Sequence, residues 1–265
     1  MELGLAGKSV VVTGGGSNIG RAISLGFAAE KVRLTIADVN LPSAQKVAAT
    51  AQEQGAQATL AVRTDVTDVD SVAAMVRAVE ERHGTIDVLV NNVGWTNDAL
   101  FVDKKRSEWE KEIQLNLWSM INCTRTVLDG MIARRSGVIV SIGSDAGRMG
   151  EYREAVYGGC KAGVIAITKS LAREVGRHGV RLNVVCPGTT MPTSDEETNE
   201  NSIWRQEGLK AWNTEEMRAK IGKAYPLRRV GRGKDISGAV VFMASSAASF
   251  ITGQTLSVSG GYTMM

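Results

Sequence analysis

The fold follows from one stretch near the N-terminus, Val10-Val11-Val12-Thr13-Gly14-Gly15-Gly16-Ser17-Asn18-Ile19-Gly20. Three successive valines are typical of a strand buried on both faces, and the residues after the glycines begin a helical pattern. Glycines in such a turn let backbone N–H groups approach a pyrophosphate at the helix N-terminus. An acid, Asp38, ends the next apolar run, where a carboxylate can bind ribose hydroxyls. Together these features predict a dinucleotide-binding unit.

Short apolar runs rich in β-branched residues recur along the chain, with helical patterns between them. We expect strands at 10–12, 32–37, 58–62, 86–90, 138–142, 180–185 and 255–258. We expect helices at about 19–30, 41–54, 68–83, 107–134, 155–176 and 235–246. This alternation predicts an α/β fold, a doubly wound parallel seven-stranded Rossmann-type sheet with helices on both faces.

The length of 265 residues suits one large α/β domain, and no Pro/Ser-rich linker divides the chain. We therefore expect a single dinucleotide-binding and catalytic domain over 1–265. The irregular stretch at about 189–225 follows the Pro187-Gly188 turn and carries scattered aromatic residues. Long excursions in compact α/β chains are usually functional, so we expect a substrate-binding loop there.

Composition excludes several other classes of protein. A formal charge of +3, without a dense basic run, argues against nucleic-acid binding. Cys123, Cys160 and Cys186 are widely spaced, which is typical of free thiols in a reducing compartment. Only His83 and His178 are available as histidine ligands, so we expect no metal site. The N-terminus resembles no signal peptide and no apolar run is long enough to span a bilayer, so we expect a soluble, cytoplasmic protein without membrane contact.

The segment Tyr157-Gly158-Gly159-Cys160-Lys161 places a phenol and an ammonium one helical turn apart. A lone Tyr-x-x-x-Lys is most often a solvated helix face. Here the glycine turn and Ser144, at the end of an expected strand, favour a catalytic site. A phenol with a pKa near 10 needs ~4 kcal/mol of electrostatic help to exchange protons near pH 7. We expect Lys161 to supply that help by lowering the phenol pKa.

The acid at the end of the second strand also indicates the cofactor. Asp38 would repel a 2′-phosphate, and Ser17 and Val39 occupy places where an NADP site would carry a cation. We therefore expect NAD. The alternative is that Asp38 only caps the next helix. The expected cofactor-binding residues are Gly14, Ser17, Asn18, Ile19, Gly20, Asp38, Asp65, Val66, Asn92, Val93, Gly94, Tyr157, Lys161, Pro187, Gly188 and Thr190.

With these motifs in order, the chain resembles the short-chain dehydrogenase/reductase family over nearly its whole length. The matching motifs are Thr13-Gly14 through Gly20, Asn91 through Gly94, Asn116, Ser144, Tyr157 with Lys161, and Pro187-Gly188. The resemblance implies that Tyr157 is the general acid/base, that Lys161 holds the nicotinamide ribose and that Ser144 binds the substrate oxygen. It also implies that Asn116 holds a water linking Lys161 to solvent, and that the protein is a homotetramer.

The sequence departs from the family pattern at three points. Asn18 replaces the middle glycine of the turn, and asparagine is the residue that best tolerates a positive φ after glycine. Val93 replaces an alanine and adds bulk near the cofactor ribose. Pro192 stands where the family has threonine, so Thr189, Thr190 or Thr193 remains to contact the nicotinamide amide.

For the substrate, the segments 144–161, 183–190 and 250–261 resemble dehydrogenases of alicyclic β-hydroxyacyl-CoA esters, of the 2-hydroxycyclohexanecarboxyl-CoA type. A CoA ester needs cations for its phosphates, and Arg148 and Arg153 flank the catalytic residues. The alternative is that both arginines are solvated surface charges that balance Glu151, Glu154 and the acids at 195–197. The alternatives are a small cyclic or aryl secondary-alcohol dehydrogenase, a 3-oxoacyl-thioester reductase and, in another class, a non-catalytic Rossmann-type subunit. The exact substrate, its stereochemistry and the direction of reaction stay open.

Overall fold

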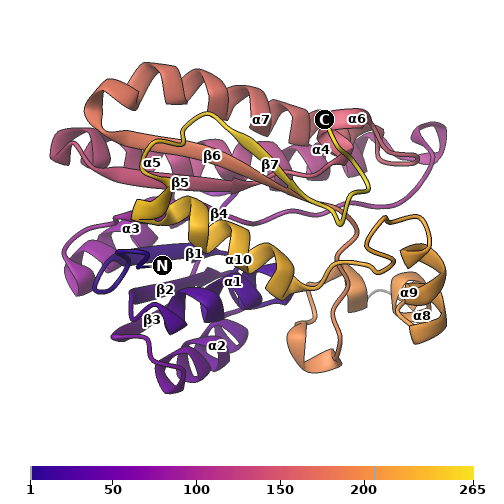
Figure 1. Cartoon of the computed structure of the whole chain (residues 1–265), viewed down its shortest axis with the longest axis horizontal. Coiled ribbons are helices and arrows are strands. Elements are labelled where there is room, and N and C mark those ends of the chain that lie inside the picture. Colours follow the sequence, from indigo (N-terminus) through magenta and orange to yellow (C-terminus); the bar gives the residue numbers. More distant parts are fainter. Residues whose placement is uncertain (1, 206) are drawn as a thin grey trace.

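A twisted seven-stranded parallel sheet, in the order β3-β2-β1-β4-β5-β6-β7, forms the centre of the computed structural model (Figure 1). Its strands are β1 (Ser9–Thr13), β2 (Arg33–Asp38), β3 (Ala58–Arg63), β4 (Val88–Asn91), β5 (Gly137–Ile142), β6 (Val180–Pro187) and β7 (Thr255–Val258). The structure describes residues 2–205 and 207–265. Met1 of the expected domain and Gln206 of the expected loop lie outside the described residues.

Ten α-helices are present in the described part of the chain. They are α1 (Asn18–Ala29), α2 (Leu41–Glu53), α3 (Val69–His83), α4 (Arg106–Ile113), α5 (Ser119–Arg134), α6 (Ala146–Met149), α7 (Ala155–Val175), α8 (Glu207–Trp212), α9 (Glu215–Gly222) and α10 (Gly233–Ala244). The doubly wound fold predicted from the sequence is confirmed, and each expected strand begins and ends within two residues of its observed limits.

Two apolar layers enclose the sheet. Helices α1, α2 and α10 cover one face through residues such as Phe27 and Ile236, and α3, α5 and α7 cover the other through residues such as Met75 and Val175 (Figure 1). Strand β1 is buried along its whole length, as its valine run predicts. The strand order reverses beside β1, between β1 and β4, and ligands of such sheets bind outside the carboxyl ends of the strands at this point.

One expected element is wrong in detail. The single helix expected over 107–134 is divided by a π-helical turn, Gln114–Trp118, between α4 and α5. Such turns insert an extra residue into the helical hydrogen-bond ladder and occur frequently at functional sites. The expected loop at 189–225 is also partly ordered, since it contains α8, α9 and two 3₁₀ turns.

Candidate active site

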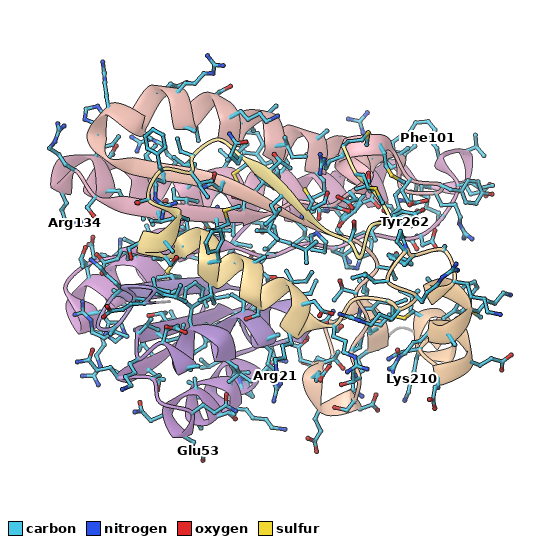
Figure 2. The ribbon with its side chains drawn as sticks, viewed as in Figure 1. Arg21, Glu53, Phe101, Arg134, Lys210 and Tyr262 are labelled. Atoms are coloured by element: carbon cyan, nitrogen blue, oxygen red, sulfur yellow. The ribbon has the colours of Figure 1, made fainter. Side chains whose placement is uncertain are left out.

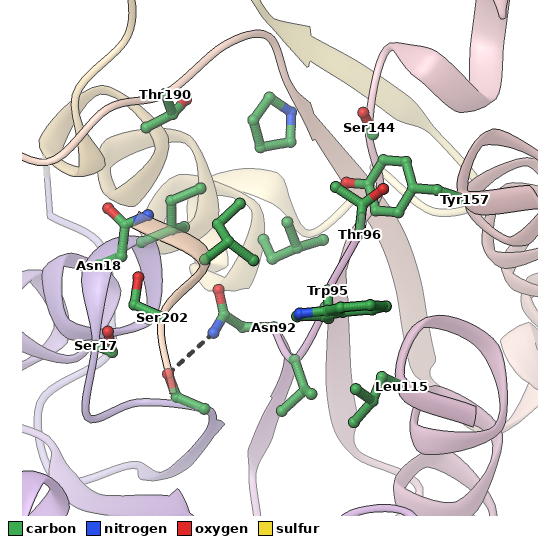
Figure 3. A pocket seen from close by; sticks show the side chains of 18 of the residues that line it. Ser17, Asn18, Asn92, Trp95, Thr96, Leu115, Ser144, Tyr157, Thr190 and Ser202 are labelled. Carbon is green, nitrogen blue, oxygen red and sulfur yellow. Dashed lines mark hydrogen bonds between the residues drawn. The ribbon is translucent and has the colours of Figure 1, made fainter. Parts of the chain in front are cut away.

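A single cavity of about 1110 Å³ opens at the carboxyl ends of β1, β4, β5 and β6. Its lining includes the glycine turn and Asp38. Figure 3 shows Ser17 and Asn18 on one side of the pocket and Ser144, Tyr157 and Trp95 on the other. A cavity of this size at the topological switch point is the place where this architecture binds a dinucleotide and a second ligand.

The glycine turn between β1 and α1 has the geometry of a close-approach site. Asn18 adopts a φ of 45°, which explains how asparagine replaces the usual glycine there. A Cβ added to Gly20 would lie 2.0 Å from the Gly14 carbonyl oxygen, so only glycine fits. Ser17 occupies the N-cap of α1, but its side chain makes no capping bond with the helix. The residues therefore fit a pyrophosphate held at the α1 N-terminus.

Asp38 ends β2 and lies beside this turn. Its two carboxylate oxygens accept hydrogen bonds from the backbone N–H groups of Gly16, at 3.0 Å, and Asn40, at 2.9 Å. Burial raises the pKa of the carboxyl, and these two bonds oppose the rise. Asp38 thus lines the cavity at the place where the sequence predicted a ribose partner.

The floor of the cavity is formed by the ends of β3 and β4, which contribute Asp65, Val66, Asn92, Val93 and Gly94. Asn92 Nδ2 donates to the carbonyl oxygens of Thr13, at 3.0 Å, and Gly14, at 3.1 Å, and so ties the end of β4 to the glycine turn (Figure 3). A Cβ on Gly94 would lie 3.0 Å from Asn116 Oδ1 and 3.1 Å from Lys161 Nζ. The absence of a side chain at Gly94 therefore lets these two polar groups approach the chain.

Tyr157 and Lys161 lie one turn apart on α7, and Ser144 follows β5. Figure 3 shows the Ser144 and Tyr157 side chains reaching into the same pocket, and a hydrogen bond from Ser144 lowers the pKa of the phenol. Lys161 is 2% exposed, and its Nζ donates at 3.0 Å to the carbonyl oxygen of Ile142 at the end of β5. The tertiary structure thus brings the three residues together.

The expected effect of Lys161 on the phenol is not found in this geometry. The pKa of Tyr157 is raised, first by burial and then by the negative charge of Glu154. Lys161 Nζ lies 5.6 Å from the centre of the Tyr157 ring. Burial lowers the pKa of Lys161 to about 8. The cost of burying the phenolate outweighs the hydrogen bond from Ser144, which is the interaction that lowers the pKa of the phenol, and Lys161 makes no resolved contribution.

Asn116 lies in the π-helical turn and is 1% exposed. Its Nδ2 donates to the carbonyl oxygens of Trp95, at 2.6 Å, and Glu112, at 2.8 Å, and its Oδ1 accepts from the Trp95 N–H at 3.1 Å. One amide hydrogen therefore holds the loop after β4, and the other bonds to the preceding turn of helix in α4. The contacts of the Asn116 side chain in this structure position residue 95, and its expected role in holding a water stays a prediction.

The turn after β6 places Pro187, Gly188, Thr189 and Thr190 along the cavity. Thr193 is not available to a nicotinamide, because its N–H and Oγ1 both donate to the Glu197 carboxylate, at 2.8 and 2.7 Å. Of the three threonines that the sequence left open, Thr189 and Thr190 remain.

Among the residues that the structure describes, Arg148 and Arg153 do not line the cavity. Arg148 donates to Ser257 Oγ on β7. Arg153 forms an ion pair with Asp98 at 3.1 Å and also donates to the Asp98 carbonyl oxygen. Both cations already have intramolecular partners, so the structure gives no support to the phosphate contacts expected for them. Lys210, in the expected substrate loop, is exposed on α8 at the outer surface of the molecule (Figure 2).

Four acidic residues near the site gave no recognisable signal in the sequence. Glu154, Glu151 and Asp98 line the substrate end of the cavity. Burial, together with Glu151 and Asp98, raises the pKa of Glu154 to about 7. Glu112 is fully buried and pairs with Lys104 at 2.6 Å. Its Oε1 also accepts from Thr96 and the Asn97 N–H, which fixes the loop that carries Trp95 and Thr96.

Within residues 2–205 and 207–265, no helix is both long and apolar enough to cross a membrane. In the same part of the chain, no group of three or more His, Cys, Asp or Glu side chains is arranged to hold a metal ion.

Comparison with known proteins agrees with this geometry. The family described as enoyl-(acyl carrier protein) reductase, a short-chain dehydrogenase/reductase family, matches residues 14–263. The 3-oxoacyl-[acyl-carrier-protein] reductase FabG of Staphylococcus aureus is 35% identical over 259 residues, covering 97% of this chain and 98% of that protein. The FabG protein of Vibrio harveyi is 36% identical over 272 residues, with 99% and 100% covered. A solved structure, the crystal structure of gox2181, superposes with a TM-score of 0.87 at 32% identity, covering 98% of this chain and 97% of that one.

Proposed function

The chain belongs to the short-chain dehydrogenase/reductase family of nicotinamide-dependent oxidoreductases, and from this premise we propose that it interconverts a β-hydroxyacyl and a β-oxoacyl thioester with NAD. The acyl group that we propose carries its hydroxyl on a ring, as in 2-hydroxycyclohexanecarboxyl-CoA. The observation that supports the reaction class is the meeting of Ser144, Tyr157 and Lys161 beside the glycine turn and Asp38, in one cavity.

Each side chain of the site has a defined role in the proposed reaction. The Tyr157 hydroxyl takes the proton of the substrate alcohol during oxidation and returns it during reduction. Ser144 donates a hydrogen bond to the substrate oxygen and stabilises charge that develops there. Lys161 binds the nicotinamide ribose, and Asn116 and Glu112 hold the loop that shapes the cavity. When bound, the cofactor would supply the hydride acceptor or donor.

The thioester part of the proposal is supported by relatives. Two FabG proteins that share 35–36% of their residues with this chain are named as reductases of 3-oxoacyl groups on a carrier protein. A ring-bearing β-hydroxyacyl thioester presents the same arrangement of oxygen, β-carbon and thioester. The cavity also has apolar surface for such an acyl group, since its lining includes Trp95, Trp204, Trp212 and Tyr262.

A second candidate is a dehydrogenase of small cyclic or aryl secondary alcohols. Two contacts favour it. Arg148 donates to Ser257 and Arg153 pairs with Asp98, so neither cation is free to bind a CoA phosphate. The acidic substrate end, with Glu151 and Glu154, also suits an uncharged ligand.

Three matched substrates distinguish the two candidates. The first two substrates are 2-hydroxycyclohexanecarboxyl-CoA and its N-acetylcysteamine thioester, which lacks the nucleotide. We expect their NAD-linked oxidation to have kcat/KM values within about tenfold of each other, because the enzyme recognises the acyl thioester that both contain. Cyclohexanol should be slower in kcat/KM by at least about 100-fold. Steady-state NADH formation provides the measurement. Equal kcat/KM for the free alcohol would establish the alcohol-dehydrogenase candidate instead.

The acidic end of the cavity gives a pH prediction. Glu154 has a pKa of about 7, and it is faced by Glu151, Asp98, Glu112, Lys104 and Tyr157. Above that pH its negative charge raises the pKa of Tyr157, so deprotonation of the phenol needs a higher pH. Glu154→Gln removes the charge, and the rise of kcat with pH in the oxidation direction should move to lower pH by about half a unit to one unit.

The same substitution should change the pH dependence of stability. The folded pKa of Glu154, about 7, lies above its ordinary value of 4.5. The stability that comes from its bound proton is therefore full below about pH 4.5 and is lost as pH rises through 7. The unfolding midpoint of Glu154→Gln should vary less between pH 5 and 8 than that of the wild type. Glu174→Gln, at the exposed far end of α7, is the control, and an identical shift in both variants would contradict the assignment.

We also propose that the protein is cytoplasmic, as its three widely spaced cysteines indicate, and that it is a homotetramer, as the family resemblance implies. The C-terminal segment carries exposed apolar side chains, Phe250, Met264 and Met265, which would be covered in such an assembly.

A further inference from the structure

A short segment, residues 193–205, crosses the cofactor end of the cavity, and we name it the strap. It is braced internally, because Thr193 donates to Glu197 and Arg205 forms an ion pair with Asp195 at 3.1 Å. Arg205 Nε also donates to Thr198 Oγ1 at 2.8 Å. The strap thus has a defined shape of its own, although it lies far along the chain from the glycine turn.

Two hydrogen bonds attach the strap to the turns that follow β1 and β2. The Asn199 N–H donates to Ser17 Oγ at 3.2 Å, which explains why Ser17 does not cap α1. Asn40 Nδ2 donates to Glu200 Oε1 at 2.9 Å. The N–H of the same Asn40 donates to Asp38 Oδ1. One residue, Asn40, therefore links the carboxylates of Asp38 and Glu200.

The strap also forms part of the cavity wall. Its residues 199 to 204 line the cavity, and Figure 3 shows Ser202 on the same side of the pocket as Ser17 and Asn18. Lys111 and Lys161 are the cations among the described lining residues, and both belong to helices at the catalytic end. A phosphate on the adenosine ribose would therefore meet two carboxylates, Asp38 and Glu200, with no lining cation beside them.

We propose that Glu200 is a second specificity residue for NAD, supplied by the strap, which excludes the 2′-phosphate of NADP by charge repulsion. This inference rests on the proposed function, because it places the adenosine ribose of a nicotinamide cofactor at Asp38. Asp38 is buried and accepts two backbone hydrogen bonds, whereas Glu200 is exposed, so solvent screens the charge of Glu200 more strongly. Repulsion between an exposed carboxylate and a phosphate dianion is moderate and is screened by salt.

The test measures dissociation constants of NADH and NADPH from the fluorescence of the reduced nicotinamide. Glu200→Gln keeps an amide oxygen that can accept from Asn40 and removes only the charge. We expect the NADPH dissociation constant to fall roughly three- to tenfold at low salt, and the NADH constant to change less than about twofold. The NADPH effect should shrink in high salt. Glu196→Gln, in the same strap but away from the cavity lining, should change neither constant.

The outcomes separate this inference from the proposed function. If the wild type binds NADH more tightly than NADPH and Glu200→Gln leaves that ratio unchanged, the role of Glu200 is overturned and the NAD assignment stands. If the wild type binds NADPH at least as tightly as NADH, the NAD assignment falls and the role of Glu200 falls with it. A loss of affinity for both cofactors in Glu200→Gln would show that the residue only shapes the strap, which also overturns the inference.

Discussion

Replacing Tyr157 by phenylalanine should lower kcat by at least about 100-fold, the range that general acid–base catalysis contributes. Phenylalanine keeps the ring that packs between Ser144 and Lys161 and removes only the hydroxyl that exchanges the proton. NADH, followed by fluorescence, should still bind. The measurement is kcat in both directions with the same thioester pair, under saturating cofactor.

A matched control lies five residues upstream. Tyr152 is 74% exposed and is not among the cavity-lining residues. Tyr152→Phe should keep full activity. Near-normal turnover by Tyr157→Phe would exclude the proposed mechanism, because no other tyrosine of the cavity has both Ser144 and Lys161 as neighbours in the described structure. Tyr262, the other tyrosine that lines it, donates instead to Glu151 at 3.0 Å.

Replacing Asp38 by alanine should narrow the preference for NAD over NADP by at least about tenfold, expressed as the ratio of the two kcat/KM values. Two changes act together. The negative charge that repels a 2′-phosphate is removed, and the backbone N–H groups of Gly16 and Asn40 lose their acceptor. Affinity for NAD should also fall, since the ribose loses its partner. Asp38→Asn keeps one acceptor oxygen and isolates the effect of charge.

Asp70→Asn, on the exposed surface of α3, is the control for a general change of charge. A wild-type preference for NADP would contradict the assignment of the cofactor from the outset. An unchanged ratio in both Asp38 variants would show that another residue determines the choice, and Glu200 would be the first to test.

The strands were predictable because a strand that is buried on both faces requires a continuous run of apolar residues. Val10-Val11-Val12 reads as an uninterrupted β-branched run, and the structure buries all three residues completely. The conformation of Asn18 was also predictable, since a positive φ restricts the choice of residue at that position. The π-helical turn around Asn116 was not predictable, because the apolar helical pattern continues on both sides of it.

The charged residues were the hardest to interpret. Arg148 and Arg153 could be read as phosphate ligands because a sequence shows the charge of a side chain and not its partner. The structure supplies those partners, Ser257 and Asp98, from segments distant in the chain. Glu154 lies three residues before Tyr157, yet its raised pKa follows from burial, from nearby Glu151, and from Asp98 and Glu112 on two segments distant in the chain.

The sequence by itself determined the doubly wound sheet, the position of the glycine turn, and the residue types that could serve as acid, base and ribose ligand. These features depend on local backbone geometry and on periodic burial, which act on residues close together in the chain. Only the tertiary structure decided that Asn116 holds the loop at Trp95, that Lys161 bonds to the end of β5, and that the strap brings Glu200 to Asn40. Hydrogen bonds and charges act over a few ångströms in space, so their partners are set by how the chain folds back on itself.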